Sequence, residues 1–192
     1  MLHPFPDLPL APRLAAVADE ARQAGVQGTV GFNYRNAPAV AAARELVGGG
    51  QLGLVTHARF RLFSDYAAHP EGALTWRYER ARGGSGVLGD LAAHGVDLVW
   101  HLLGEVDSVV ADTAIFLPER ARHGAYAAFQ PGSDLAMGFD DLKVIEAHNF
   151  LRSIAEGTPH GTTLADAVRS AATLDAMARS AETGTWVEVA DT

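Results

Sequence analysis

The sequence predicts an α/β fold of the α+β kind, in which helices pack against a mainly antiparallel sheet. Several long segments carry apolar residues at helical spacing and end at a glycine. Residues 52–65 alternate between apolar and polar side chains, as a half-buried antiparallel strand does. Residues 12–33 are typical of a helix that feeds a short strand, which is half of an α/β unit without the partners that would bury it.

The expected helices have recognisable ends. Pro12 suits the first turn of a helix over residues 12–24, and Gly25 ends it. Asn36 is a candidate cap for a helix over 37–47, and Gly157 ends an amphipathic helix over 141–156. The row Thr-Leu-Ala-Asp at 163–166 resembles a capping box for a helix over 164–183.

The expected strands are shorter and rest on alternation or β-branched content. They cover residues 27–33, 52–65, 106–117 and 186–189. Residues 66–82 form a polar loop with Trp76 and Arg77, and residues 118–139 are rich in glycine and proline without any period. An internal loop of that length is unusual in a compact domain. It is a candidate lid, a partner-binding segment or a place where structure has been lost.

Composition excludes several functional classes. The chain has 192 residues, of which 48% are hydrophobic and 20% charged, so a disordered protein is not expected. Its longest apolar runs are too short to span a membrane, and its first residues lack the order of a signal peptide. It has no cysteine, which suits the cytoplasm. The net charge is −8 and Lys143 is the single lysine, so nucleic acid is not an expected partner.

The stretch GGSGVLGDLAAHGVDLVWHLLGE, residues 83–105, is the most informative part of the chain. A glycine-rich turn leads into an apolar helix that carries Asp90, His94, Asp97 and His101. Their spacing places all four on one face of a regular helix. A carboxylate one turn before an imidazole is a usable acid/base pair, because the anion can fix the tautomer of the ring and raise its basicity.

Other interpretations of this polar stripe stay open. An Asp–His pair at helical spacing is often only a structural hydrogen bond. Asp and His also bind divalent metals, but four groups spread along about 16 Å of helix, at about 1.5 Å per residue, cannot share one ion without ligands from elsewhere.

Three glycines, Gly84, Gly86 and Gly89, form the pattern G-x-G-x-x-G. A dinucleotide fingerprint follows a buried strand, whereas the preceding residues TWRYERAR are polar and charged. We therefore interpret these glycines as a tight turn and not as a nucleotide site.

Segments along most of residues 12–189 resemble, in order, the Gfo/Idh/MocA family, which includes glucose–fructose oxidoreductase and inositol 2-dehydrogenase. They are VGFNYRNAPAVAAARELVGGGQLG, the pair WR, GGSGVLGDLAAHGVDLVWHLLGEV and FLRSIAEGTPHGTTLADAVRSAATLDAMARSAETGTWVEV. The resemblance implies an N-terminal Rossmann domain that binds NAD or NADP. It also implies a C-terminal domain whose open, mainly antiparallel sheet, with helices on one face, holds a sugar or polyol.

The resemblance also implies roles for single residues. Asp90 and His94 match the catalytic pair, in which the histidine takes the proton of a substrate hydroxyl as hydride leaves for the nicotinamide. Asn33 and Tyr34 match positions that face substrate. The substrate-binding residues expected beside them are Trp76, Arg77 and Asp97.

The chain departs from the family pattern in ways that shape the prediction. The Glu-Lys-Pro motif of the family is absent from the sequence, and Lys143 is not at the matching position. We expect residues 1–34 to be a remnant of the dinucleotide-binding domain, its last helix and strand. Residues 35–192 are expected to form the C-terminal domain, shortened around 118–140.

The resulting prediction is an NAD(P)-dependent sugar or polyol oxidoreductase lineage, with this chain as the substrate side and inactive alone. A homo-oligomer through the sheet face is expected, with no metal, nucleic acid or membrane partner. Two alternatives remain, a non-catalytic binding or oligomerisation module and a metal-dependent sugar isomerase or lyase.

Overall fold

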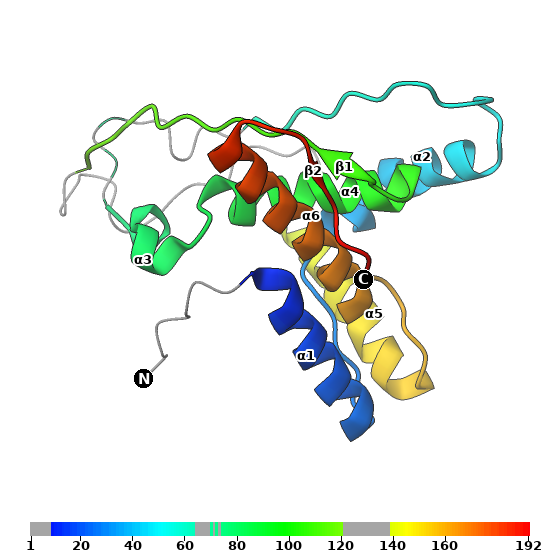
Figure 1. Cartoon of the computed structure of the whole chain (residues 1–192). Helices are drawn as coiled ribbons and strands as arrows, with labels where there is room; N and C mark the ends of the chain where they lie inside the picture. Colours follow the sequence, from blue (N-terminus) through cyan, green and yellow to red (C-terminus); the bar gives the residue numbers. More distant parts are fainter. Residues whose placement is uncertain (1–8, 64–69, 71, 73, 121–138) are drawn as a thin grey trace.

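A computed structural model of the chain describes residues 9–63, 70, 72, 74–120 and 139–192. Helices dominate these ranges, together with one pair of very short strands (Figure 1). The elements in chain order are α1 (Leu10–Ala24), the 3-10 helix η1 (Asn33–Asn36), α2 (Pro38–Gly48), the 3-10 helix η2 (Trp76–Tyr78), α3 (Arg80–Gly83), the π-helical turn η3 (Leu88–Ala92), α4 (Ala93–Leu103), β1 (Ser108–Val109), α5 (Phe139–Glu156), α6 (Leu164–Thr183) and β2 (Val187–Glu188).

Helix α6 lies at the centre of this arrangement. α1 and α4 both pack against it, and both strands contact it (Figure 1). Most side chains of its buried face are small, which lets neighbouring backbones approach closely. The buried residues of α6 are Asp166, Ala167, Ser170, Ala171, Ala172, Thr173, Leu174, Ala176 and Ser180.

The predicted end of α1 at Gly25 and both predicted ends of α6 are confirmed, whereas α1 begins at Leu10, two residues before its predicted start. Thr163 and Asp166 form the expected capping box, with the Thr163 hydroxyl accepting from the Asp166 amide at 3.2 Å. Asp175 of α6 caps the start of α1. Its carboxylate accepts hydrogen bonds from the backbone amides of Leu10 and Ala11 at 3.0 and 2.8 Å. A carboxylate at a helix N-terminus satisfies orphan N–H groups.

A small apolar core joins α4 to α6. Ala93 and Val96 of α4 meet Leu174 of α6, and Phe32, Ala92, Trp100 and Met177 surround them. The crossing of α4 and α6 also has a polar contact, because the Trp100 indole N–H donates to the Thr173 hydroxyl at 2.9 Å.

The sheet is much smaller than the sequence pattern predicts. Within the described ranges only β1 and β2 pair, antiparallel, with Ser108 opposite Glu188 and Val109 opposite Val187. Residues 27–32 and 52–63 are not strands, so these two strand predictions are wrong over the residues that the structure describes. Residues 110–117 do not continue β1, so the strand predicted over 106–117 is wrong in extent. An alternating pattern forms a strand only where a neighbouring strand pairs with its backbone, and the described residues supply no such neighbour there. The predicted loop over 118–139 lies mostly outside the described residues.

These unpaired segments carry large apolar side chains in water. Leu54 and Phe116 are each 89% exposed, and Phe63 and Ile115 are nearly as exposed. Among the described residues, no helix has the length and hydrophobicity that a membrane crossing requires.

A buried ion-pair network connects η1, α4 and α6. The Arg35 guanidinium donates to both Asp97 oxygens, at 2.7 and 2.5 Å, and its Nη2 lies 3.4 Å from Asp166. Arg169 donates to Asp166 at 2.5 Å and lies over the Trp100 ring. The side chain of Asp97 is only 1% exposed. A buried carboxylate is tolerated when it is paired in this bidentate way.

Replacing Arg35 with Met is expected to lower the free energy of unfolding by about 3–5 kcal/mol, because it leaves the Asp97 charge buried without its partner. Urea denaturation followed by circular dichroism measures this loss. R22M is the control, since Arg22 pairs with Asp19 at the surface and its loss should cost less than about 1 kcal/mol. The double variant R35M/D97L should recover most of the loss. Equal stability of R35M and R22M would contradict this account.

Candidate functional site

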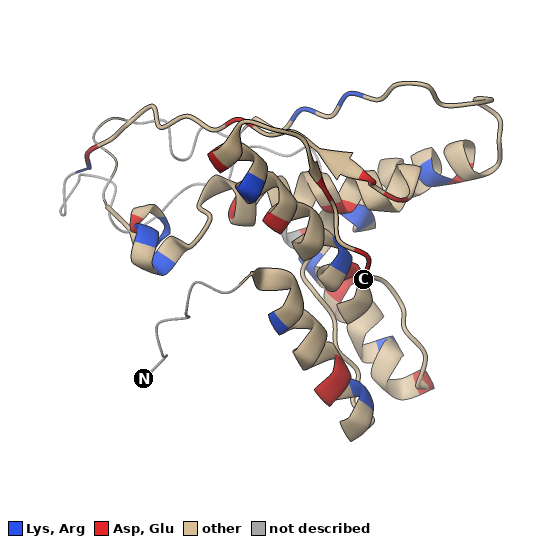
Figure 2. Cartoon of the chain, in the orientation of Figure 1, with Lys and Arg blue, Asp and Glu red and all other residues tan. Residues whose placement is uncertain are grey.

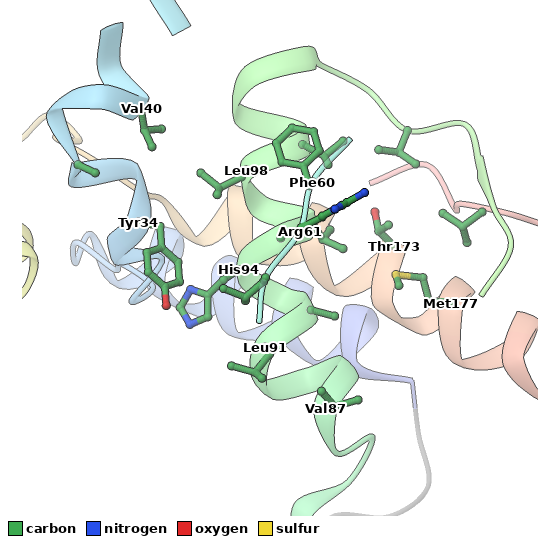
Figure 3. Close-up of a pocket in the computed structure, with 18 residues that line it drawn as sticks. Tyr34, Val40, Phe60, Arg61, Val87, Leu91, His94, Leu98, Thr173 and Met177 are labelled. Carbon is green, nitrogen blue, oxygen red and sulfur yellow. The ribbon is translucent and has the colours of Figure 1, made fainter. Parts of the chain in front are cut away.

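His94 lies in the first turn of α4, in contact with two aromatic rings from the segment before α2. Its ring meets Tyr34 edge-to-face with centroids 4.9 Å apart, and Phe32 with centroids 6.0 Å apart. Figure 3 shows His94 and Tyr34 side by side. His94 Nδ1 is buried and has no hydrogen-bond partner among the described residues. The two rings therefore hold the imidazole by packing.

A cavity of about 610 Å³ opens beside His94. Figure 3 shows that it runs along the face of α4, with side chains from α6 and from residues 60–62 around it. Tyr34, Arg61, His94 and Thr173 are its polar lining residues. The others are Ala37, Val40, Phe60, Leu62, Val87, Leu91, Ala92, Gly95, Val96, Leu98, Val99, Val106, Val109 and Met177. An apolar cavity with a few convergent polar groups is the usual form of a small-molecule site.

The surroundings of His94 favour the neutral ring. Burial is the main cause of its lowered pKa, and the charge of Lys143 lowers the pKa further. The carboxylates of Asp90 and Glu146 act in the opposite direction. A neutral imidazole can accept a proton, and the two carboxylates stabilise the cation that then forms. His94 is therefore suited to act as a base.

Asp90 lies near His94 but not in the position that a regular helix would give it. Residues 88–92 form a π-turn, whose extra residue per turn rotates Asp90 out of the expected stripe. Its carboxylate lies 3.6 Å from Nε of Arg77. Because His94 Nδ1 lacks a partner among the described residues, it donates no hydrogen bond to Asp90 that would fix the tautomer of the ring. The influence of Asp90 on His94 is electrostatic.

Arg77 and Trp76 come from η2, in the loop before the glycine turn. The Arg77 guanidinium lies 4.6 Å above the Trp76 ring, so the two form a cation–π pair next to Asp90. The structure thus brings Arg77 to the catalytic candidate, as expected for a loop close to the site. Neither residue is among those that line the cavity beside His94.

Asn33 and Asp97 are both buried. Asn33 is fully buried, and its amide oxygen and nitrogen have no hydrogen-bond partner among the described residues. Asp97 pairs with Arg35, and burial raises its pKa to about 6 against the opposing effect of that arginine. Neither lines the cavity, so a substrate contact of Asn33 or Asp97 stays a prediction. The stripe ends at His101, where burial lowers the pKa to about 4.

The structure adds Lys143 and Glu146 of α5 to this neighbourhood. Lys143 Nζ lies 3.5 Å from Glu146 Oε2, and both side chains lie next to Gly31. Sequence reasoning missed them because they lie about fifty residues away from His94 and outside any recognised motif. Their one signal was that Lys143 is the single lysine of the chain.

The described residues do not fit a dinucleotide cofactor. Gly84 and Gly86 have positive φ values of 57° and 58°, and they follow helix α3 and not a strand, which confirms the interpretation as a tight turn. The described ranges also contain no parallel sheet to carry a pyrophosphate-binding turn. For a metal, no group of three or more His, Asp or Glu side chains in these ranges is placed to bind an ion.

Two family models match the sequence. One, described as the GFO/IDH/MocA C-terminal domain, matches residues 40–142, and the other, the C-terminal alpha/beta domain of an oxidoreductase family, matches residues 131–189. The chain belongs to the Gfo/Idh/MocA family. The match over both halves confirms the family resemblance and the α/β fold class predicted from the sequence.

Curated relatives of this Gfo/Idh/MocA chain include sugar dehydrogenases. It is 36% identical over 105 residues to levoglucosan dehydrogenase of Pseudarthrobacter phenanthrenivorans, covering 55% of this chain and 27% of that enzyme. It is 33% identical over 85 residues to glucose-6-phosphate 3-dehydrogenase of Bacillus subtilis, covering 44% of this chain and 24% of that enzyme. The matched residues thus span about a quarter of each relative.

Solved structures of the family share the fold. Levoglucosan dehydrogenase in complex with NADH and levoglucosan matches with a TM-score of 0.77 at 24% identity, over 95% of this chain and 71% of that one. An oxidoreductase domain protein from Kribbella flavida matches with a TM-score of 0.80 at 24% identity, over 94% of this chain and 70% of that one.

Replacing Tyr34 with Ala is expected to raise the pKa of His94 toward its ordinary value of 6.5, because water then reaches the ring and burial is the largest cause of the shift. NMR titration of the His94 ring protons measures this change. F63A is the matched control, since Phe63 is 87% exposed and should not affect His94. An unchanged His94 pKa in Y34A would show that ring packing does not set its basicity.

Proposed function

We propose that this chain is the substrate-side part of an NAD(P)-dependent oxidoreductase that acts on a sugar or polyol. The observation that carries the proposal is the placement of His94, a neutral imidazole at the edge of a cavity with two carboxylates nearby. Residues 35–192 would form the substrate domain, and residues 1–34 would belong to the dinucleotide-binding domain of the family. Membership of an oxidoreductase family and the named sugar dehydrogenases support this proposal.

The chemistry that we assign to His94 is proton acceptance from a hydroxyl group. The O–H bond breaks, the proton passes to a ring nitrogen, and the oxygen keeps the electron pair. Burial keeps the ring neutral beforehand, and Asp90 and Glu146 stabilise the imidazolium afterwards. The apolar cavity walls would exclude water and strengthen these interactions. The described residues have no parallel sheet that could carry a pyrophosphate-binding turn, so the nicotinamide would bind to a part of the protein outside them.

The test is binding of levoglucosan and myo-inositol to the chain, measured by calorimetry. Replacing His94 with Asn should weaken binding by about tenfold, because a hydrogen bond to the ligand hydroxyl is lost. The control E156Q, in a surface pair with Arg152 on α5, should bind like the wild type. Fluorescence titration with NADH and NADPH should show no tight binding, and activity of the chain alone should be negligible. Tight NADH binding, or equal affinities of H94N and wild type, would contradict the proposal.

A second candidate is an oligomerisation module, favoured by the exposed apolar side chains of the unpaired segments. Leu54, Phe63, Ile115 and Phe116 are each at least 83% exposed. Such surfaces often mark an interface between chains, and extended segments can pair with those of a second copy.

Size-exclusion chromatography with light scattering tests this second candidate. A dimer or larger assembly is expected, and F63D/F116D should shift it toward the monomer because the charges oppose apolar contact. The control L10D changes an apolar side chain at the start of α1, away from these segments. A monomeric wild-type chain at all concentrations would rule the module out.

A further inference from the structure

The polar groups of the cavity beside His94 lie in two separate places. Figure 3 shows the Tyr34 hydroxyl next to the His94 ring, and the charged end of Arg61 directed away from both. Arg61 has no carboxylate partner among the described residues, and none of the described acidic side chains lines the cavity. An imidazole and a hydroxyl at one place and a guanidinium at another therefore face the same cavity.

The rest of the cavity wall offers a ligand almost only apolar surface. Thr173 is the one further polar lining residue, but its hydroxyl donates to the Arg169 carbonyl at 3.2 Å and accepts from the Trp100 indole at 2.9 Å. This hydroxyl therefore has no hydrogen left to donate to a ligand. The larger apolar side chains of the wall include Val40, Phe60, Leu62, Leu98, Val99 and Met177.

An unsubstituted sugar does not match this apolar wall. Hydroxyl groups cover its surface, and those placed against Leu98, Val99 or Met177 would lose water without gaining another partner, which disfavours binding. The cavity volume of about 610 Å³ also lies in the range of about 300–1,000 Å³ that is typical of sites for drug-sized molecules, which are larger than one sugar ring. The space beyond the sugar therefore suits an apolar group.

We propose that the substrate is a glycoside whose aglycone is apolar and ends in an anionic group, a carboxylate or a phosphate. This inference rests on the proposed function of His94 as the base for a sugar hydroxyl. The sugar lies at His94 and Tyr34, the aglycone packs along Leu98 and Val99 of α4, and the anion accepts hydrogen bonds from Arg61. A guanidinium suits this role because its parallel N–H groups match two oxygens of a carboxylate or phosphate.

The test is calorimetry of the chain with a series of β-glucosides. Phenyl glucoside should bind about tenfold more tightly than methyl glucoside, because the phenyl ring buries apolar surface against the cavity wall. 4-Carboxyphenyl glucoside should gain about a further tenfold through the charge-assisted hydrogen bonds to Arg61. The corresponding phosphate ester of 4-hydroxyphenyl glucoside is measured alongside, and the tighter of the two identifies the anion that the site prefers.

Variants assign each gain in affinity to one part of the cavity. L98Q should abolish most of the gain from methyl to phenyl, and V40Q on α2 should do the same, which keeps the test valid if one variant fails to fold. R61M should abolish the gain from the anion and leave phenyl glucoside binding unchanged. The controls are L46Q, at a 43% exposed leucine of α2, and R59M, at an exposed arginine, and neither residue lines the cavity.

Salt separates the two contributions to affinity. The gain from the anion should shrink in 1 M NaCl, because Arg61 is exposed and its charge is screened, whereas the gain from the phenyl ring should persist. Equal affinities for methyl and phenyl glucoside, or no gain from either anion, overturn the inference, and so does an equal loss in R61M and R59M. None of these results affects the proposed function, which fails instead if H94N binds levoglucosan as tightly as the wild type.

Discussion

The bidentate ion pair between Arg35 and Asp97 is the contact on which the arrangement around His94 depends. Arg35 follows directly after Asn33 and Tyr34, and Asp97 lies one turn after His94 on α4. The pair therefore holds η1 against α4, and the Tyr34 ring reaches the His94 ring as a consequence. Asp166 extends the network to α6 and at the same time caps that helix. Three elements that are far apart in the chain meet at one guanidinium group.

Charge and burial together set the basicity of His94. Figure 2 shows basic and acidic residues mixed along α5 and α6 in this view. Individual charges from two elements affect the pKa of His94. Asp90 acts from η3, the turn that leads into α4, and Lys143 and Glu146 act from α5. Burial by the aromatic rings is the larger effect. Burial lowers the pKa of the His94 ring, and the neighbouring charges then raise or lower that pKa by smaller amounts.

The cavity beside His94 follows from the small extent of the sheet. α4 is apolar around much of its surface, and α6 covers only part of it. Where a broader sheet would cover the rest, the structure has the extended residues 60–62 and the short strand β1, which leave an open apolar space. The same lack of strand partners exposes Leu54 and Phe116. Cavity and exposed apolar surface thus have one physical cause.

Local rules were enough to predict the helices, since capping residues, proline, glycine and apolar spacing all act within a few residues. The extent of α6 between Thr163 and Gly184 and the turn at Gly84 and Gly86 follow from these rules. The strands did not follow, because a strand needs a partner that local sequence does not specify. The tertiary structure alone decided that Asp97 pairs with Arg35 and that Lys143 and Glu146 lie next to Gly31. Both depend on contacts between segments tens of residues apart, which no local pattern encodes.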